Sequence, residues 1–261
     1  MSSEQDRDTP GRDVLDSISI AAFDLDARIF RTLWHSIVRT PDVALAAVQG
    51  DFSRYLSPVR VFVALFGLQF VVAALLGTPL TGTIDQFTSH ADDGIVADWL
   101  AAGRTAGGNV PTIAEIDTAL EAWGSLLLWP IFIIASLPYL VLLKLYRLRL
   151  PLWAHLQFYL VPTNASFIVM IAIIPIQIAG MGWFMLALAP ALGLYYVCMG
   201  WLIVRFYSRS ALGTALRLGG LVLLLPVTLI LSSIGQLLGT AWILDSQFGL
   251  SLIELFRLDS L

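Results

Sequence analysis

The chain is poor in the residues from which most catalytic and metal sites are built. It contains one cysteine and three histidines among 261 residues. A single cysteine, Cys198, forms neither an internal disulfide nor a paired-cysteine metal site. The sequence also lacks a nucleophile elbow, a phosphate-binding loop, a metalloprotease helix and a pair of catalytic carboxylates. We therefore expect a protein that is not an enzyme, with no catalytic residue, no cofactor and no metal site.

Charged residues are scarce as well. They make up 13% of the chain, whereas soluble domains carry roughly 25%, and apolar residues make up 57%. Mean hydropathy is +0.80. This composition excludes a soluble globular domain, and the net charge of -4 gives no indication of a nucleic-acid partner. The predicted fold class is all-α, in the form of a polytopic membrane protein.

Five apolar stretches are long enough to cross a membrane. A helix needs ~20 residues to span the ~30 Å hydrocarbon core, and each stretch approaches or exceeds this length. The third and fourth stretches are separated by residues 179–182 alone, so we expect them to pack as an antiparallel hairpin. The membrane domain covers 58–244, with predicted spans at about 59–77, 122–143, 156–178, 183–204 and 219–244.

The chain ahead of the first span divides into two parts. Residues 1–22 are acidic with scattered apolar positions, which predicts a disordered tail. Residues 23–57 predict an amphipathic helical segment, in which Thr40 as N-cap and Pro41 mark the start of a second short helix. The apolar stripe of the first helix suits the headgroup layer of an anionic leaflet or a neighbouring protein surface. This stripe is formed by Ile29, Phe30, Leu33, Trp34, Ile37 and Val38.

The segments that connect the spans differ in charge. When the five spans alternate in direction, every Lys and Arg except Arg104 and Arg257 falls on one side, and the long loop 78–121 on the other side is acidic. The positive-inside rule then places the N-terminus in the cytoplasm and the C-terminal segment 245–261 outside, in the periplasm. Tryptophans at the span ends predict aromatic anchors at both interfaces: Trp123, Trp183 and Trp242 outside, Trp153 and Trp201 inside.

A basic loop connects the second span to the third. Lys144, Arg147 and Arg149 lie on this loop. Arg205 and Arg209 follow the fourth span on the same predicted side. Clusters of bases beside a membrane span attract anionic lipid headgroups. We therefore expect these side chains to contact lipid headgroups or a protein partner at the cytoplasmic surface.

Two polar residues in the third span are further candidates. His155 lies where the basic loop meets the span, and its near-neutral reference pKa leaves open a ligand or pH-sensing role beside that of an ordinary interfacial side chain. Asn164 follows Pro162, which removes a backbone donor and predicts a bent helix. In the outer loop, His90 and the aspartates after it offer metal-ligand donors, but such groupings arise often by chance in polar loops.

Prolines are the main irregularity of the spans. Such breaks can shape a substrate cavity, or they can let kinked helices pack. The spans carry no ionisable groups in their interiors other than tyrosine and Cys198, which disfavours an ion-coupled transporter. Gly235 and Gly239 in the fifth span predict a close approach to a neighbouring helix. The prolines are Pro130, Pro138, Pro162, Pro175, Pro190 and Pro226.

Several short motifs stand at the edges of the spans. They are Arg39-Thr40-Pro41, Arg54-Tyr55-Leu56-Ser57-Pro58, His155-Leu156 after the basic loop, and Arg205-Phe206-Tyr207-Ser208. Together they resemble a widespread group of uncharacterised bacterial inner-membrane proteins over the chain from Asp24 to about Leu218. The resemblance implies a bacterial inner-membrane location and no particular activity. Members of that group commonly carry an N-terminal zinc ribbon, which this chain lacks. The topology is also similar to that of five-span Yip-type trafficking proteins.

Three functions are compatible with these features. The first is a non-enzymatic membrane scaffold or accessory subunit, whose basic face binds anionic lipid, a protein partner or a second copy of the chain. The second is a small transporter or facilitator that uses the proline-broken spans as its pathway. The third is an envelope-stress or pH sensor that depends on His155.

Overall fold

Helices form the framework of the described structure. This computed structural model describes residues 27–78, 83–88 and 92–258, so the predicted tail 1–22 and His90 lie outside the described residues. The prediction of an all-α, multi-pass membrane protein with five spans is confirmed. The helical stretches long and apolar enough to cross a membrane are Pro58–Leu76, Ile113–Tyr146, Leu152–Ala179, Gly182–Tyr207 and Ala211–Phe248.

Two of the spans change their winding near one end. The third span remains α-helical through Pro162 and tightens into a 3-10 helix beside Pro175. The fourth span ends in a π-helical turn. The span helices are α3 (Pro58–Leu76), α6 (Ile113–Tyr146), α7 (Leu152–Ile173) with η1 (Ile174–Ala179), α8 (Met181–Leu202) with η2 (Ile203–Tyr207), and α9 (Ala211–Phe248).

Helices α6 and α9 are longer than the predicted spans 122–143 and 219–244. They contain 34 and 38 residues, which at 1.5 Å per residue corresponds to about 50 and 57 Å. Helix α6 starts early because Thr112 and Glu115 form a capping box. The apolar stretch of a helix indicates which part of it crosses the hydrocarbon core. The capping residues determine where the helix itself begins and ends.

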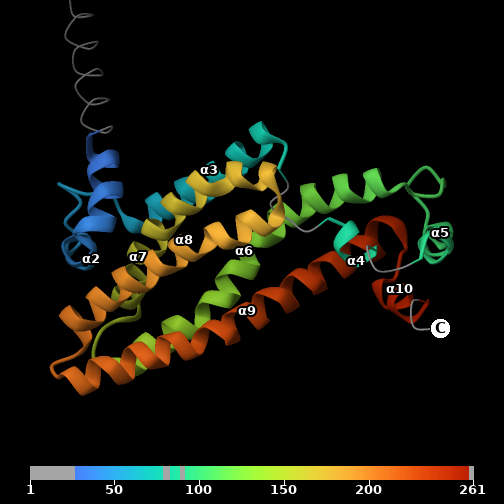
Figure 1. Ribbon diagram of the computed structural model, residues 1–261. Helices are drawn as coiled ribbons and strands as arrows, with labels where there is room; N and C mark the ends of the chain where they lie inside the picture. The colour runs from blue at the N-terminus through green and yellow to red at the C-terminus, as the bar shows by residue number, and fades with distance from the viewer. Residues whose placement is uncertain (1–26, 79–82, 89–91, 259–261) are drawn as a thin grey trace, which may run out of the picture.

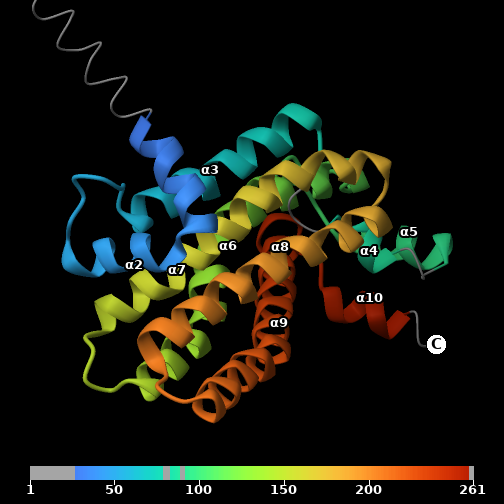
Figure 2. The same cartoon turned by 60° about the vertical axis from the view of Figure 1, so that its left-hand side comes forward.

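The spans pack in two groups. Helices α3, α7 and α8 form a bundle, and α6 pairs with α9 beside it (Figures 1 and 2). Helix α6 also contacts α7, whereas α9 packs mainly against α6 and η2. The side of α9 that faces away from α6 and η2 is exposed to the surrounding medium.

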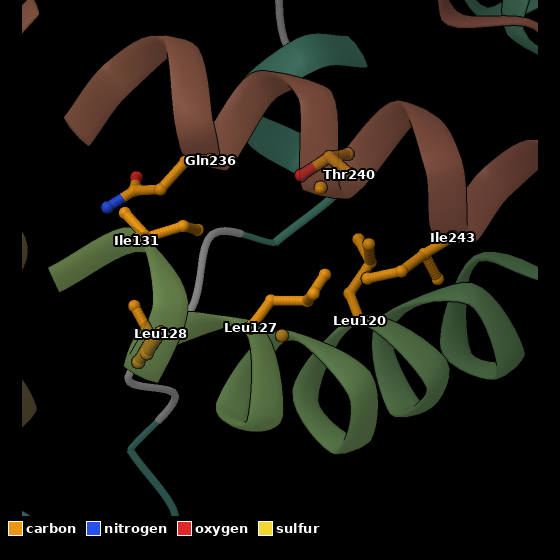
Figure 3. Close-up of a pocket in the computed structure, with 9 residues that line it drawn as sticks. Leu120, Leu127, Leu128, Ile131, Gln236, Thr240 and Ile243 are labelled. Atoms are coloured by element: carbon orange, nitrogen blue, oxygen red, sulfur yellow. The ribbon is translucent and has the colours of Figure 1, made fainter. Parts of the chain in front are cut away.

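The α6–α9 seam is narrow because α9 presents small residues to it. A Cβ added at Gly235 would lie 3.1 Å from Ile131, and one added at Gly239 would lie 3.1 Å from Leu127. The predicted close approach at these glycines is therefore confirmed. Figure 3 shows the side chains that meet along the seam, where a cavity of only ≈ 30 Å³ remains.

Helix α7 lies at the centre of the bundle. Nearly every side chain between Ala154 and Ala165 is buried. The side-chain amide of Asn164 donates to the Pro58 carbonyl in the first turn of α3 (2.9 Å), and the Ser166 hydroxyl donates to the Ala191 carbonyl of α8 (2.9 Å). Helices α7 and α8 pack side by side, which confirms the predicted hairpin.

The two ends of the bundle have different contents. At one end lie α2 (Thr40–Gln49), loop 147–151 and loop 208–210; we call this the basic end. At the other lie α4 (Asp85–Thr88), α5 (Asp93–Ala102) and α10 (Leu252–Leu258); we call this the acidic end (Figure 1). The first and last described helices are thus at opposite ends, as five crossings require.

The acidic end carries a small folded cap where the sequence predicted only a loop at 78–121. The buried Trp99 of α5 donates from its indole nitrogen to the Ser251 carbonyl (2.9 Å), and the Asp117 carboxylate accepts from the Ile84 amide (2.7 Å). The cap was missed because its core joins segments far apart in the chain. That core consists of Ile84, Trp99, Ile116, Leu120, Ile243, Leu244, Phe248, Leu250, Leu252 and Leu255.

Replacing Gly103 by alanine tests the packing of this cap. A Cβ at position 103 would lie 2.7 Å from Cγ of the buried Leu250. We predict a destabilisation of about 1–3 kcal/mol, the usual cost of overpacking. Faster amide hydrogen exchange in α5 and α10 would report it. The matched control is Gly94→Ala, because nothing lies within 4 Å of a Cβ there. Unchanged exchange in Gly103→Ala would contradict the prediction.

Candidate anion-binding site

A pocket opens at the basic end between the end of α8, the start of α9 and the loop after α6. Its volume is ≈ 550 Å³. Four of the nine residues that line it are arginines, and none of the nine carries a carboxylate. We call it the basic pocket. It is lined by Arg147, Arg205, Phe206, Tyr207, Ser208, Arg209, Ser210, Gly213 and Arg217.

The start of α9 forms one wall of the basic pocket. Ser210 is the N-cap of α9, and its hydroxyl accepts a hydrogen bond from the Gly213 amide (3.1 Å). A Cβ at Gly213 would lie 2.9 Å from the Ser210 hydroxyl and 3.1 Å from the Ser208 hydroxyl. Glycine therefore permits this close packing. The positive end of the helix dipole adds to the positive charge of the arginines.

Two of the arginines are held in place by neighbouring groups. The Arg147 guanidinium donates to the Phe206 carbonyl of η2 (2.5 Å). The Arg217 guanidinium lies over the Tyr146 ring, 5.7 Å from its centroid, and the Tyr146 hydroxyl donates to the Arg217 carbonyl (2.8 Å). Arginine has five N–H donors, so contacts of this kind orient the side chain and leave donors for a ligand.

His155 supports the pocket from behind. It is fully buried, and its Nδ1 lies 2.7 Å from the Tyr207 hydroxyl. Tyr207 lines the pocket, whereas His155 does not. The π-helical turn η2 presents Arg205, Phe206 and Tyr207 together, and such turns occur frequently at functional sites. His155 therefore positions one wall of the pocket.

The other predicted candidates lie elsewhere. Lys144 donates from Nζ to the carbonyls of Leu148 (2.7 Å) and Leu150 (2.5 Å). It therefore stabilises the loop that follows α6. Arg149 is exposed and does not line the pocket. Asn164 lies further along α7 and joins it to α3.

Of the predicted residues, the structure brings Arg147, Arg205 and Arg209 together in the basic pocket. Arg217 was not predicted as a member of the pocket, because residues 211–218 lie outside the predicted span 219–244. In the structure they form the first turns of α9. Ser210 before an apolar run was the N-cap signal that could have corrected this.

The N-terminal helix, residues 27–38, crosses the basic end next to α2 (Figures 1 and 2). Its buried face is polar. The Thr32 hydroxyl donates to the Arg28 carbonyl (2.7 Å) and accepts from the Leu56 amide (2.9 Å). The Thr40 hydroxyl donates back to the Ser36 carbonyl (2.7 Å), and α2 starts at Thr40 with Arg39 as its N-cap. The prediction that Thr40 is the N-cap was therefore wrong.

The apolar stripe of the N-terminal helix faces away from the described protein. Phe30 is 73% exposed and Trp34 is 55% exposed. Ile29 and Val38 are exposed as well. The stripe is therefore free to contact lipid at the basic end.

His35 lies between this helix and the loop that follows α2. Its Nδ1 is 2.8 Å from the Tyr55 hydroxyl. Burial, and after it the charges of Arg39, Arg54 and Arg31, lower the pKa of His35, with a smaller opposing effect of Asp42. The neutral form of His35 therefore favours the docked helix.

No protein-family model, no curated protein and no solved structure matches this chain. The resemblance to bacterial inner-membrane proteins stays a prediction. Within residues 27–78, 83–88 and 92–258, no group of three or more His, Cys, Asp or Glu residues is placed to hold a metal ion.

Acidification is predicted to loosen the N-terminal helix. Because the pKa of His35 is lower in the folded protein than in the unfolded chain, its contribution to stability is present above about pH 6.5 and declines as the pH falls below that value. Amide hydrogen exchange in residues 27–38, corrected for the intrinsic rate, should rise on acidification. His35→Gln should remove this pH dependence. A pH dependence retained in His35→Gln would assign it to another group.

Proposed function

We propose that this protein is a non-enzymatic membrane scaffold or accessory subunit whose basic pocket binds the phosphate group of an anionic lipid. The observation that carries the proposal is the convergence of four arginines and a helix N-terminus around one opening at the ends of the spans. In this proposal the basic end faces the cytoplasm, as the positive-inside rule indicates.

The charge around the pocket favours an anionic ligand. The sequence has no Asp or Glu from residue 122 to residue 244, the stretch that supplies all nine lining residues. Arginine pairs with phosphate through two parallel hydrogen bonds, which gives both energy and geometry. The Ser208 and Ser210 hydroxyls can add further donors at the same opening.

The surroundings of the pocket favour a lipid over a free phosphate ion. Trp153 and Trp201, both near the basic end of their spans, are about half exposed, as expected of anchors at the headgroup layer. The apolar stripe around Phe30 and Trp34 lies at the same end. A second opening of ≈ 420 Å³, lined in part by Arg28, Arg60 and Trp153, lies beside the N-terminal helix. These features support a basic end immersed in headgroups.

The chemistry of the lining supports binding and not catalysis. Arginine, serine and tyrosine provide positive charge and hydrogen-bond donors. His155 contacts Tyr207 from behind the wall and is not among the lining residues, so no imidazole faces the opening as a general base. A scaffold that recognises lipid needs only positive charge and hydrogen-bond donors.

The double variant Arg205→Gln with Arg217→Gln tests the proposal. Hydrogen bonds to charged groups contribute about 1.5–3 kcal/mol each, so we predict that affinity for short-chain phosphatidylglycerol falls tenfold or more. The measurement is the shift in Tm of the purified protein on titration with that lipid, because a ligand that binds the folded state stabilises it.

The matched control is Arg149→Gln, which removes one base from the same end but not from the pocket. It should bind nearly as the wild type does. Phosphatidylcholine and inorganic phosphate are titrated in parallel. A Tm shift with inorganic phosphate equal to that with phosphatidylglycerol would assign the pocket to a free anion. Equal losses of affinity in Arg149→Gln and in the double variant would show that the lipid responds to general surface charge and not to the pocket.

A further inference from the structure

A second cavity lies between the two groups of spans, away from the basic pocket. Its volume is ≈ 270 Å³, and it is partly open to the surroundings. All five spans contribute to it. Its lining extends from the middle of the spans toward the acidic end, where it includes Gln69 of α3, Gln177 of η1 and Gln236 of α9.

The cavity lies beside the contacts that join α6 to the bundle. Toward the basic end, the Tyr139 hydroxyl of α6 bonds to the Tyr196 hydroxyl of α8 (2.9 Å), and the Tyr139 ring stacks on Tyr159 of α7 with centroids 6.1 Å apart. These contacts join the two groups. At the level of the cavity, Phe66 of α3 packs on Trp129 of α6 with centroids 4.1 Å apart, and α9, which packs mainly against α6, supplies Ser232 and Gln236 to the lining.

Aromatic rings form the apolar wall of the cavity. Phe132 of α6 and Phe167 of α7 have centroids 5.9 Å apart, and Phe66 of α3 lies 6.1 Å from each of them. Phe184 and Met170 extend this wall. A flexible alkyl chain is the ligand class that such a wall accommodates, because the contact is apolar and requires no fixed hydrogen bonds.

Glutamines supply the polar part of the lining. The side-chain oxygen of Gln177 is buried and has no hydrogen-bond partner among the described residues. This oxygen is an acceptor, so leaving it buried without a hydrogen-bond donor costs free energy. Gln177 lies in η1, the last turns of the third span at the acidic end. A ligand with a hydroxyl donor near Gln177 and an apolar part deeper in the membrane matches this arrangement.

We infer that this cavity holds one acyl chain of a membrane lipid from the leaflet at the acidic end. The lipid is one with a free glycerol hydroxyl, such as a diacylglycerol; this hydroxyl donates to Gln177, and the chain extends toward Phe167 and Phe132. A lipid is the fitting occupant because the opening lies within the spans, where the surrounding medium is lipid. The site is independent of the basic pocket, which lies at the opposite end.

Photocrosslinking in vesicles tests this inference. The full chain is placed in phosphatidylcholine vesicles with a trace of diacylglycerol that carries a diazirine on one acyl chain. Crosslinked residues are mapped by mass spectrometry after illumination. A diazirine near the ester should label the turn that contains Gln177, and a diazirine near the terminal methyl should label Phe132 or Phe167.

A variant that fills the cavity provides the decisive comparison. Ser232 lines the cavity, whereas its neighbour Ser233 is exposed and does not. Ser232→Phe should abolish labelling of Phe132, Phe167 and Gln177, and Ser233→Phe should leave it unchanged. Labelling of the exposed side chain of Val71 serves as the internal reference in both variants.

Two outcomes would overturn the inference. One is the absence of cavity labelling in the wild type while Val71 is labelled. The other is labelling of the cavity in Ser232→Phe at the wild-type level. Circular dichroism and gel filtration establish that each variant is folded. If Ser232→Phe does not fold, Met170→Trp fills the same cavity from α7 and is judged by the same loss of labelling.

Discussion

The lack of water inside a bilayer is the constraint on which this structure depends. Each polar group in a span is most stable when it finds a partner in the protein, and the central helix α7 finds some of its partners on neighbouring helices. Asn164 reaches the carbonyl of Pro58, and Ser166 reaches the carbonyl of Ala191. These bonds set how α3 and α8 pack around α7. Among the described residues, the side chains of Gln157 and Gln177 keep buried polar atoms without a partner.

The same constraint determines where the charged residues lie. Groups that cannot enter the hydrocarbon gather at the ends of the spans, with arginines at the basic end and carboxylates in and around the cap at the acidic end. At the basic end the arginines converge on one opening because η2 and the N-terminus of α9 adjoin the loop that carries Arg147. At the acidic end α6 and α9 continue past the membrane and support the buried Trp99. The two ends are therefore built for different surroundings.

The arrangement of the spans places the two proposed lipid sites at different levels of a small protein. Tyr139 joins α6 to the bundle toward the basic end, and Trp129 and Phe132 join it to α3 and α7 at the level of the cavity. The basic pocket offers charge at the surface, and the cavity around Phe167 offers an apolar lining at depth. In these proposals one end recognises a headgroup and the other end holds a chain. Both roles suit a scaffold embedded in lipid.

The sequence by itself determined the all-α class, the five spans, the hairpin of the third and fourth spans and the seam at Gly235, because apolar length, short connections and glycine spacing are local properties. Of the candidate site, it identified Arg147, Arg205 and Arg209 but missed Arg217. Only the tertiary structure decided which bases share a pocket, that Lys144 stabilises the loop that follows α6, and that Trp99 anchors a cap. The physical reason is that these features depend on the approach of segments distant in the chain, which local patterns of polarity do not encode.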